Sequence, residues 1–296
     1  MSTKPTFYRQ RFLLSLLRVI NHAVSQTDLQ KHSFLFSQQH SMGYEFIPYQ
    51  FGCYSLQLNQ DINTLEQAGF VEVIDKKIKL LEQNSMAWMK TADSNQLFKY
   101  PKEHRQMAGD NLIGFVYKNY PYYAINSKII NRVCDSEEQA KIQKEQAKIT
   151  KDTTVIYTLG YEGISLEAYI NKLIKNDVKL LCDVRKNPLS RKFGFSYKTL
   201  NNLLPKVGID YIHIPQLGIE SNKRQDLDSQ ESYKKLFDEY ETTLPNREEA
   251  LNQVLALQKK YQRIALTCFE KSHHECHRHC VSDYLANHHN TQTIHL

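Results

Sequence analysis

Residues 264–280 read IALTCFEKSHHECHRHC, and they decide how we interpret the rest of the chain. The first three residues are apolar, as in a buried strand of a covered sheet. The stretch then changes to reactive and charged side chains, and residues 281–289 have a helical pattern. In α/β proteins, a buried strand followed by a polar loop and a helix N-terminus forms ligand sites at the carboxyl edge of the sheet. We therefore predict a functional site here.

The C-terminal half alternates predicted strands with predicted helices. We expect strands at residues 153–159, 179–182, 210–214 and 264–268, with a further strand at 293–295. Helices are expected after Ser165, at 196–204, at 233–240 and at 247–261. This alternation predicts an α/β fold with a mainly parallel, Rossmann-like sheet that helices cover on both faces.

Polar side chains follow three of these strands. They are Tyr161 and Glu162 after the first strand, Asp183, Arg185, Arg191 and Lys192 after the second, and Cys268 and Glu270 after the fourth. Because the carboxyl ends of parallel strands meet at one edge of a sheet, we expect these side chains to converge there. His213, in the third strand, is expected at the rim of that pocket.

The N-terminal half has the order of a winged helix-turn-helix. Helices are predicted at residues 10–22, from Thr27 or Asp28 to 38, and at 56–68, the last with Ser55 as its N-cap and Gly69 as its C′ residue. Residues 70–74 and 77–81 alternate apolar and polar side chains, which predicts a β-hairpin. The third helix would read the nucleic acid, and the hairpin would be the wing of this α+β domain.

The third helix offers Asn and Gln side chains but no Lys or Arg, so phosphate contacts must come from elsewhere. The candidates are the wing lysines Lys76, Lys77 and Lys79 and, in or next to the first helix, Arg9, Arg11 and Arg18. Winged helices also serve as protein-interaction modules, and that alternative stays open.

Residues 138–142 and 145–149 both read EQAKI, within a charged segment. A seven-residue period on a helix can support a two-turn coiled-coil contact, so a homodimer is one option. The predicted domains are a winged-helix-like domain with a helical extension at 1–134, a charged helical linker at 135–152 and the α/β domain at 153–296.

The composition is that of an ordinary globular protein, with 41% apolar and 24% charged residues. No apolar run is long enough to span a membrane, and the first residues do not form a signal-peptide pattern. Six cysteines in 296 residues are too few for a disulfide framework, so we expect reduced thiols and a cytoplasmic protein. The net charge of +6 permits nucleic-acid binding without requiring it.

Five motifs of the C-terminal half occur in an order that resembles the bacterial family catalogued as domain of unknown function 488. They are TLGYEG at 158–163, CDVRKNPLSRKFGFS at 182–196, residues 211–213 with 215–218, TCFE at 267–270 and CHR at 276–278. The resemblance covers about residues 154–296, and it implies an α/β domain without implying a reaction. The signature polar residues of the family correspond to Asp183, Arg185, Ser190, Arg191, Cys268, Glu270, Cys276, His277 and Arg278.

Several interpretations of the cysteine-rich stretch stay open. Cys268, Cys276, His277 and Cys280 could bind a structural zinc ion, since Cys276 and Cys280 are one helical turn apart. Cys276 or Cys268 could instead be a catalytic thiolate beside His277 and Arg278. Small buried cysteines could also lie next to an ion-pair network of Asp183, Arg185, Glu270 and Arg278. The string CDVR at 182–185 resembles rhodaneses, which would imply sulfur transfer, although the order of the remaining motifs differs.

The functional interpretation we favour is carboxylate chemistry in a cationic pocket. Arg185, Arg191, Lys192 and Arg278 would bind phosphate, with Tyr161 and Ser190 as further ligand-binding residues. Asp183 or Glu270 would be the general base or would position a water. With a winged helix, this predicts an enzyme that hydrolyses a phosphodiester or N-glycosidic bond in a nucleic acid or nucleotide. The alternative is a non-enzymatic DNA-binding regulator whose α/β domain senses a nucleotide, and the sequence identifies no cofactor.

Overall fold

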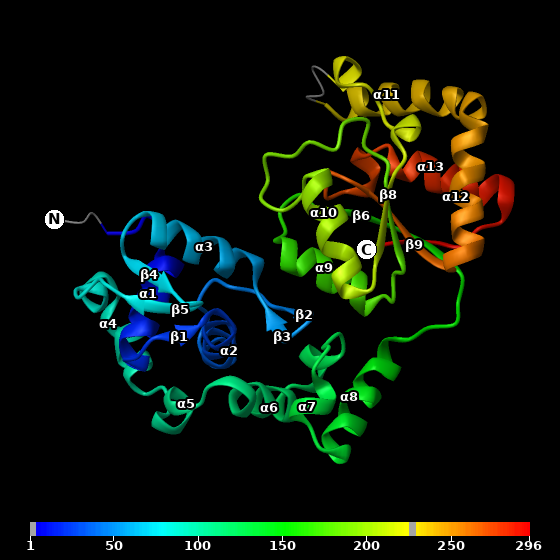
Figure 1. Ribbon diagram of the computed structural model, residues 1–296. Helices are drawn as coiled ribbons and strands as arrows, with labels where there is room; N and C mark the ends of the chain where they lie inside the picture. The colour runs from blue at the N-terminus through cyan, green and yellow to red at the C-terminus, as the bar shows by residue number, and fades with distance from the viewer. Residues whose placement is uncertain (1–3, 225–228) are drawn as a thin grey trace. The chain divides into compact units, whose positions relative to one another are not determined.

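A computed structural model describes residues 4–224 and 229–296, and the chain forms two compact units, residues 1–148 and 149–296 (Figure 1). Each unit has its own core and is described by itself. The domain boundaries proposed above remain a prediction that limited proteolysis can test. Within the described ranges, none of the helices is both long and apolar enough to cross a lipid bilayer.

The first unit contains three helices and a small antiparallel sheet. The helices are α1 (Tyr8–Ile20), α2 (Gln26–Ser37) and α3 (Leu56–Gln67), and the sheet has the order β1 (Val24–Ser25), β5 (Lys77–Leu80), β4 (Val71–Ile74). The predicted hairpin is confirmed, and Asp75 and Lys76 at its turn have φ angles of 49° and 62°, as tight hairpin turns require. The Ser55 hydroxyl caps α3 by accepting a hydrogen bond from the Leu58 N–H. The interpretation of these elements as a winged helix remains a prediction.

The second helix begins earlier than predicted. Its N-cap is Ser25, whose hydroxyl accepts a hydrogen bond from the Asp28 N–H at 3.0 Å, so neither Thr27 nor Asp28 is the cap. The preceding strand gives the reason. Ser25 pairs with Lys77 in the sheet, so the chain is extended up to Ser25 and becomes helical directly after it.

A β-ribbon and a series of short helices complete the first unit. β2 (Ile47–Tyr49) pairs with β3 (Gly52–Tyr54), and this ribbon was not predicted from the sequence. The segment after the hairpin is largely helical, with η1 (Ser85–Trp88), α4 (Thr91–Phe98), α5 (Lys102–Gln106), α6 (Gly109–Asn119), η2 (Pro121–Ala124), α7 (Ile130–Val133) and α8 (Ser136–Ile149). Ile142 of α8 is buried, and Glu138 near the start of this helix pairs with Lys118 of α6 at 3.7 Å.

The second unit is built on a five-stranded sheet in which all strands are parallel. The strands lie in the order β10 (Thr293–His295), β6 (Val155–Gly160), β9 (Arg263–Cys268), β7 (Leu180–Asp183), β8 (Asp210–His213). The predicted α/β class with a parallel sheet is confirmed. The strand that opens the stretch 264–280 is β9, and it occupies the centre of the sheet with all six of its residues buried.

Helices cover both faces of this sheet (Figure 1). On one side lie α9 (Leu166–Lys175) and α10 (Tyr197–Leu203), and on the other α11 (Gln230–Thr243), α12 (Glu248–Tyr261) and α13 (Arg278–His289). Alternate residues of β9 face the two sides: Ile264 and Leu266 belong to the core formed with α11, α12 and α13, whereas the Thr267 hydroxyl receives a hydrogen bond from Tyr169 of α9 at 2.7 Å. The helices predicted at 233–240 and 281–289 are confirmed, and both begin a few residues earlier than predicted.

The segment between α8 and β6 should be the first place that a protease cuts. Residues 150–154 are exposed and lie outside any helix or strand. We expect trypsin at low dose to cleave after Lys148 or Lys151 and to leave two stable fragments, because the flanking units have separate cores. Mass spectrometry of the products identifies the cut.

The double variant Lys148→Gln, Lys151→Gln tests this directly, and trypsin should cut it more slowly between α8 and β6. Lys144→Gln, inside α8, is the control and should behave like the unchanged chain. First cleavage within the second unit would contradict the proposed boundary.

Candidate functional site

A cleft of about 370 Å³ opens at the carboxyl edge of the sheet, between the loops that follow β6, β7 and β9. The predicted site residues that line it are Tyr161, Arg185, Ser190, Arg191, Lys192, Cys268, Glu270 and His277. Lys186, Asn187, Leu189, Ile219 and Phe269 line it too, and the sequence analysis did not assign them to the site. The sequence could have indicated them only by their positions, since most of them are direct neighbours of residues that were assigned to the site.

The loop after β9 is held across the end of β6. The Phe269 carbonyl accepts hydrogen bonds from the backbone N–H groups of Tyr161 and Glu162, at 3.1 and 2.9 Å. Gly160 allows this close approach, because a Cβ at that position would lie 1.7 Å from the Glu270 carbonyl oxygen. The path of this loop determines where the Glu270 side chain meets the cleft.

Arg278 has a different role from the predicted ligand contact. It is 1% exposed, and its guanidinium donates to the carbonyl oxygens of Glu270 and Lys271, at 2.7 and 3.1 Å. It is not among the residues that line the cleft. Arg278 therefore fixes the loop after β9 from the first turn of α13.

Asp183 is committed to a buried ion pair, and this revises its predicted role as a base. Its carboxylate accepts hydrogen bonds from the Arg185 backbone N–H, from Nε at 2.8 Å and from Nη2, and the Tyr211 hydroxyl donates to it at 2.6 Å. The side chain is fully buried and does not line the cleft. A carboxylate with these donors stabilises the loop that follows β7 and has little capacity left for a substrate.

Arg185 joins this ion pair to the end of β6. Its Nη1 donates to the Tyr161 hydroxyl at 2.7 Å and to the Phe195 carbonyl at 2.9 Å. The Tyr161 and Phe195 rings stack with centroids 4.3 Å apart. Because most N–H groups of Arg185 have partners within the protein, it holds the 186–195 loop in place and is a poor phosphate ligand.

The cations left to meet a ligand come from the 186–195 loop. Lys186 and Arg191 are exposed and line the cleft. Lys192 is half-buried, and its ammonium donates to the Tyr161 carbonyl. Burial lowers the pKa of Lys192. Arg191 is thus the residue best placed to give a bidentate contact to phosphate.

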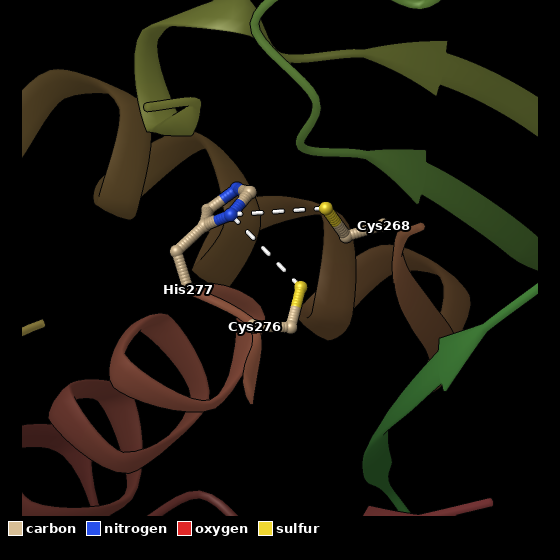
Figure 2. Close-up of side chains that lie close together, drawn as sticks. All are labelled: Cys268, Cys276 and His277. Atoms are coloured by element: carbon tan, nitrogen blue, oxygen red, sulfur yellow. Dashed lines mark hydrogen bonds between the residues drawn. The ribbon is translucent and has the colours of Figure 1, made fainter. Parts of the chain in front are cut away.

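Cys268, Cys276 and His277 form a buried group beside the cleft (Figure 2). The Nδ1 atom of His277 lies 3.7 Å from the Cys268 sulfur and 4.0 Å from the Cys276 sulfur. Nε2 lies 3.0 Å from the Val184 carbonyl oxygen and must donate to it, because that oxygen is an acceptor only. In the neutral ring, this bond assigns the tautomer in which the Nδ1 lone pair points toward both sulfurs.

The remaining cysteines do not join this group. Cys280 lies instead with Glu241 and His279, so the four predicted zinc ligands are divided between two clusters. Burial raises the pKa of the Cys276 thiol, which disfavours a free catalytic thiolate there. Cys182, in the rhodanese-like string, is fully buried in the sheet core, which disfavours sulfur transfer at that atom.

The basic residues predicted for the N-terminal half fall into two classes. Arg9 pairs with the buried Asp61 at 2.6 Å, and Arg11 donates to the carbonyl oxygens of Pro5 and Thr6. Both therefore have intramolecular partners. Lys76, Lys77 and Lys79 of the hairpin are exposed.

The fold and the cleft define this half as a parallel α/β domain with its candidate site at the carboxyl edge of the sheet. Residues 165–285 match the family model described as Domain of unknown function DUF488, which confirms the resemblance seen in the motifs. A search of curated proteins found no significant match, and a search of solved structures found none either.

Replacing the Asp183 carboxylate should destabilise the second unit. Asp183→Asn leaves the buried Arg185 guanidinium without its counter-charge, and breaking a buried pair in this way costs about 3–5 kcal/mol. Thermal and urea denaturation of the full chain measure the loss. Glu220→Gln is the control, since it breaks an exposed ion pair with Lys186 and should cost at most about 1 kcal/mol. If Asp183→Asn were as stable as the unchanged chain, the structural role of the Asp183–Arg185 pair would be contradicted.

Proposed function

We propose that the C-terminal domain binds a nucleotide or nucleic acid in the cleft and hydrolyses a phosphodiester or N-glycosidic bond in it. One observation carries this proposal: a single cleft combines exposed cations, exposed apolar surface and one buried carboxylate, that of Glu270. Those are the groups that phosphates, bases and a hydrolytic water require.

The cationic and apolar parts suit the two ends of a nucleotide. Arg191 and Lys186 offer planar and point-charge donors for phosphate oxygens. Phe269 is 41% exposed and Leu189 is 76% exposed, although both belong to a cleft. An exposed aromatic ring next to cations supports base stacking, which does not depend on base sequence.

Glu270 is the carboxylate we assign as the general base. It is 6% exposed and lines the cleft, on a loop that Arg278 and the end of β6 hold in place. In the proposed reaction a water oxygen bonds to the phosphorus or the anomeric carbon as the bond to the leaving group breaks. Glu270 accepts the proton from that water, and the leaving group takes a proton from solvent.

The alternative is a regulator that binds DNA through the first unit and a nucleotide in the cleft without hydrolysing it. The commitment of Asp183 to Arg185 favours this alternative, because it removes one of the two predicted carboxylates from the cleft. Turnover by the Glu270 variant separates the two functions.

Glu270→Gln keeps the shape of the side chain and removes its basicity. If Glu270 is the base, turnover of single-stranded, duplex or mononucleotide substrates falls by about 100-fold or more while ligand affinity changes little. If the domain only senses a ligand, neither the unchanged chain nor the variant hydrolyses any of the three substrates, and the regulatory function replaces the enzymatic one.

Arg191→Ala tests the phosphate contact in the same assays. Loss of a charge-assisted hydrogen bond should weaken ligand binding by about 10-fold or more. Lys206→Ala is the control, because it removes the same charge far from the cleft. Lys206 is exposed and lies just before β8 begins, at the opposite edge of the sheet. Equal effects of the two substitutions would show that only net charge matters and would contradict binding in the cleft.

For the first unit we propose weak nucleic-acid binding through the phosphates. The exposed lysines Lys76, Lys77 and Lys79 lie on β5 and the turn before it. Changing all three to Ala should weaken binding and lower the salt dependence by roughly one unit per lost contact. Lys141, Lys144 and Lys148 of α8, changed together to Ala, are the charge-matched control. If the unchanged chain does not bind at low salt, the protein-interaction alternative replaces this one.

A further inference from the structure

We propose that Cys268, Cys276 and His277 bind one zinc ion, whose fourth coordination position opens toward the cleft. This goes beyond the proposed hydrolysis and does not rest on it. The zinc site considered from the sequence had four protein ligands, including Cys280. The site proposed here has three, and its fourth coordination position is open.

The ligand atoms already have nearly the spacing that zinc needs. Tetrahedral coordination with Zn–S bonds of about 2.3 Å and a Zn–N bond of about 2.0 Å places a sulfur and a nitrogen about 3.5 Å apart. In the structure, Nδ1 of His277 is 3.7 Å from one sulfur and 4.0 Å from the other, and all three ligand atoms lie within 4.8 Å of one another. The two nitrogen–sulfur distances therefore need to shorten by only a few tenths of an ångström for an ion to bind.

The surroundings of His277 are those of a metal ligand. A coordinating imidazole needs a lone pair on the ligating nitrogen and usually donates its other N–H to a carbonyl or carboxylate. The Nε2–H bond to the Val184 carbonyl supplies that partner, because Val184 follows directly after β7. His277 is 2% exposed, so this bond holds the ring in one orientation.

Two sulfurs and one imidazole nitrogen favour zinc over hard cations such as magnesium or calcium. In the described part of the chain the group has three members, and three protein ligands with one open position are typical of catalytic zinc sites. Cys268 and His277 both line the cleft, and we therefore assign the open position to the side that faces the space a ligand would enter.

The first measurement is the metal content of the full-length chain purified under reducing conditions without chelators. We expect about one zinc per chain. Replacing the zinc by Co²⁺ should give a thiolate-to-metal charge-transfer band and the intense visible absorption of tetrahedral cobalt. These spectra use the unchanged chain, so they do not depend on whether a variant folds.

Variants then locate the ion. Cys276→Ser and His277→Ala should each weaken zinc binding by more than about 100-fold, since even partners outside the coordination sphere are worth 10–100-fold. Cys280→Ser is the matched control and should keep the zinc, because Cys280 lies in the other cluster, with Glu241 and His279. Circular dichroism confirms that each variant is folded.

Three results would overturn the proposal. One is a chain that neither contains zinc nor gives the cobalt spectrum. Another is loss of zinc in Cys280→Ser but not in Cys276→Ser, which would move the ion to the second cluster. The third is a disulfide between Cys268 and Cys276 in protein alkylated at lysis. An unchanged chain that retains zinc but hydrolyses none of the three substrates would contradict the proposed function and leave the zinc site intact.

Discussion

The guanidinium of Arg278 is the group on which the candidate site depends most. From the start of α13 it donates to the carbonyl oxygens of Glu270 and Lys271, and so joins the loop after β9 to the helix that follows it. Gly160 is the necessary counterpart, because a side chain there would occupy the place of the Glu270 carbonyl. Together they fix Cys268 and Glu270 relative to His277 before any ligand binds, and such preorganisation is what electrostatic catalysis requires.

The opposite wall of the cleft depends on the pair of Asp183 and Arg185. A buried ion pair contributes little net stability, because removing two charges from water offsets most of their attraction. Its value here is geometric. The planar guanidinium takes both carboxylate oxygens and directs Nη1 to Tyr161 and Phe195. The loop that carries Arg191 is thereby held at one end, while Arg191 itself stays exposed.

Local signals predicted the elements well, and non-local packing explains what they missed. Ser55, Ser165 and Ser196 cap the helices that follow them, as serine before an apolar helical pattern indicates. The position of β9 between β6 and β7 has no local signal, since strand order depends on how distant helices pack. Asp183 shows the same limit at the site: the sequence places a carboxylate near an arginine, but only side-chain direction decides whether they meet each other or a ligand.

Side-chain direction also distinguishes two possible roles of the buried cysteines, a catalytic thiolate and a pair of zinc ligands. A thiolate nucleophile at Cys268 would need the Glu270 carboxylate, 3.4 Å from the sulfur, or Nδ1 of His277, 3.7 Å from it, to take the thiol proton. Transfer to His277 creates a thiolate and an imidazolium away from water. Nε2 of His277 donates to the neutral Val184 carbonyl and not to a carboxylate, so that imidazolium lacks the partner that orients and stabilises the histidine of a catalytic triad. A divalent cation between the sulfurs removes the difficulty, since it stabilises both thiolates and uses the neutral imidazole in the tautomer that this bond selects. The Val184 hydrogen bond therefore favours His277 as a ligand over His277 as a base.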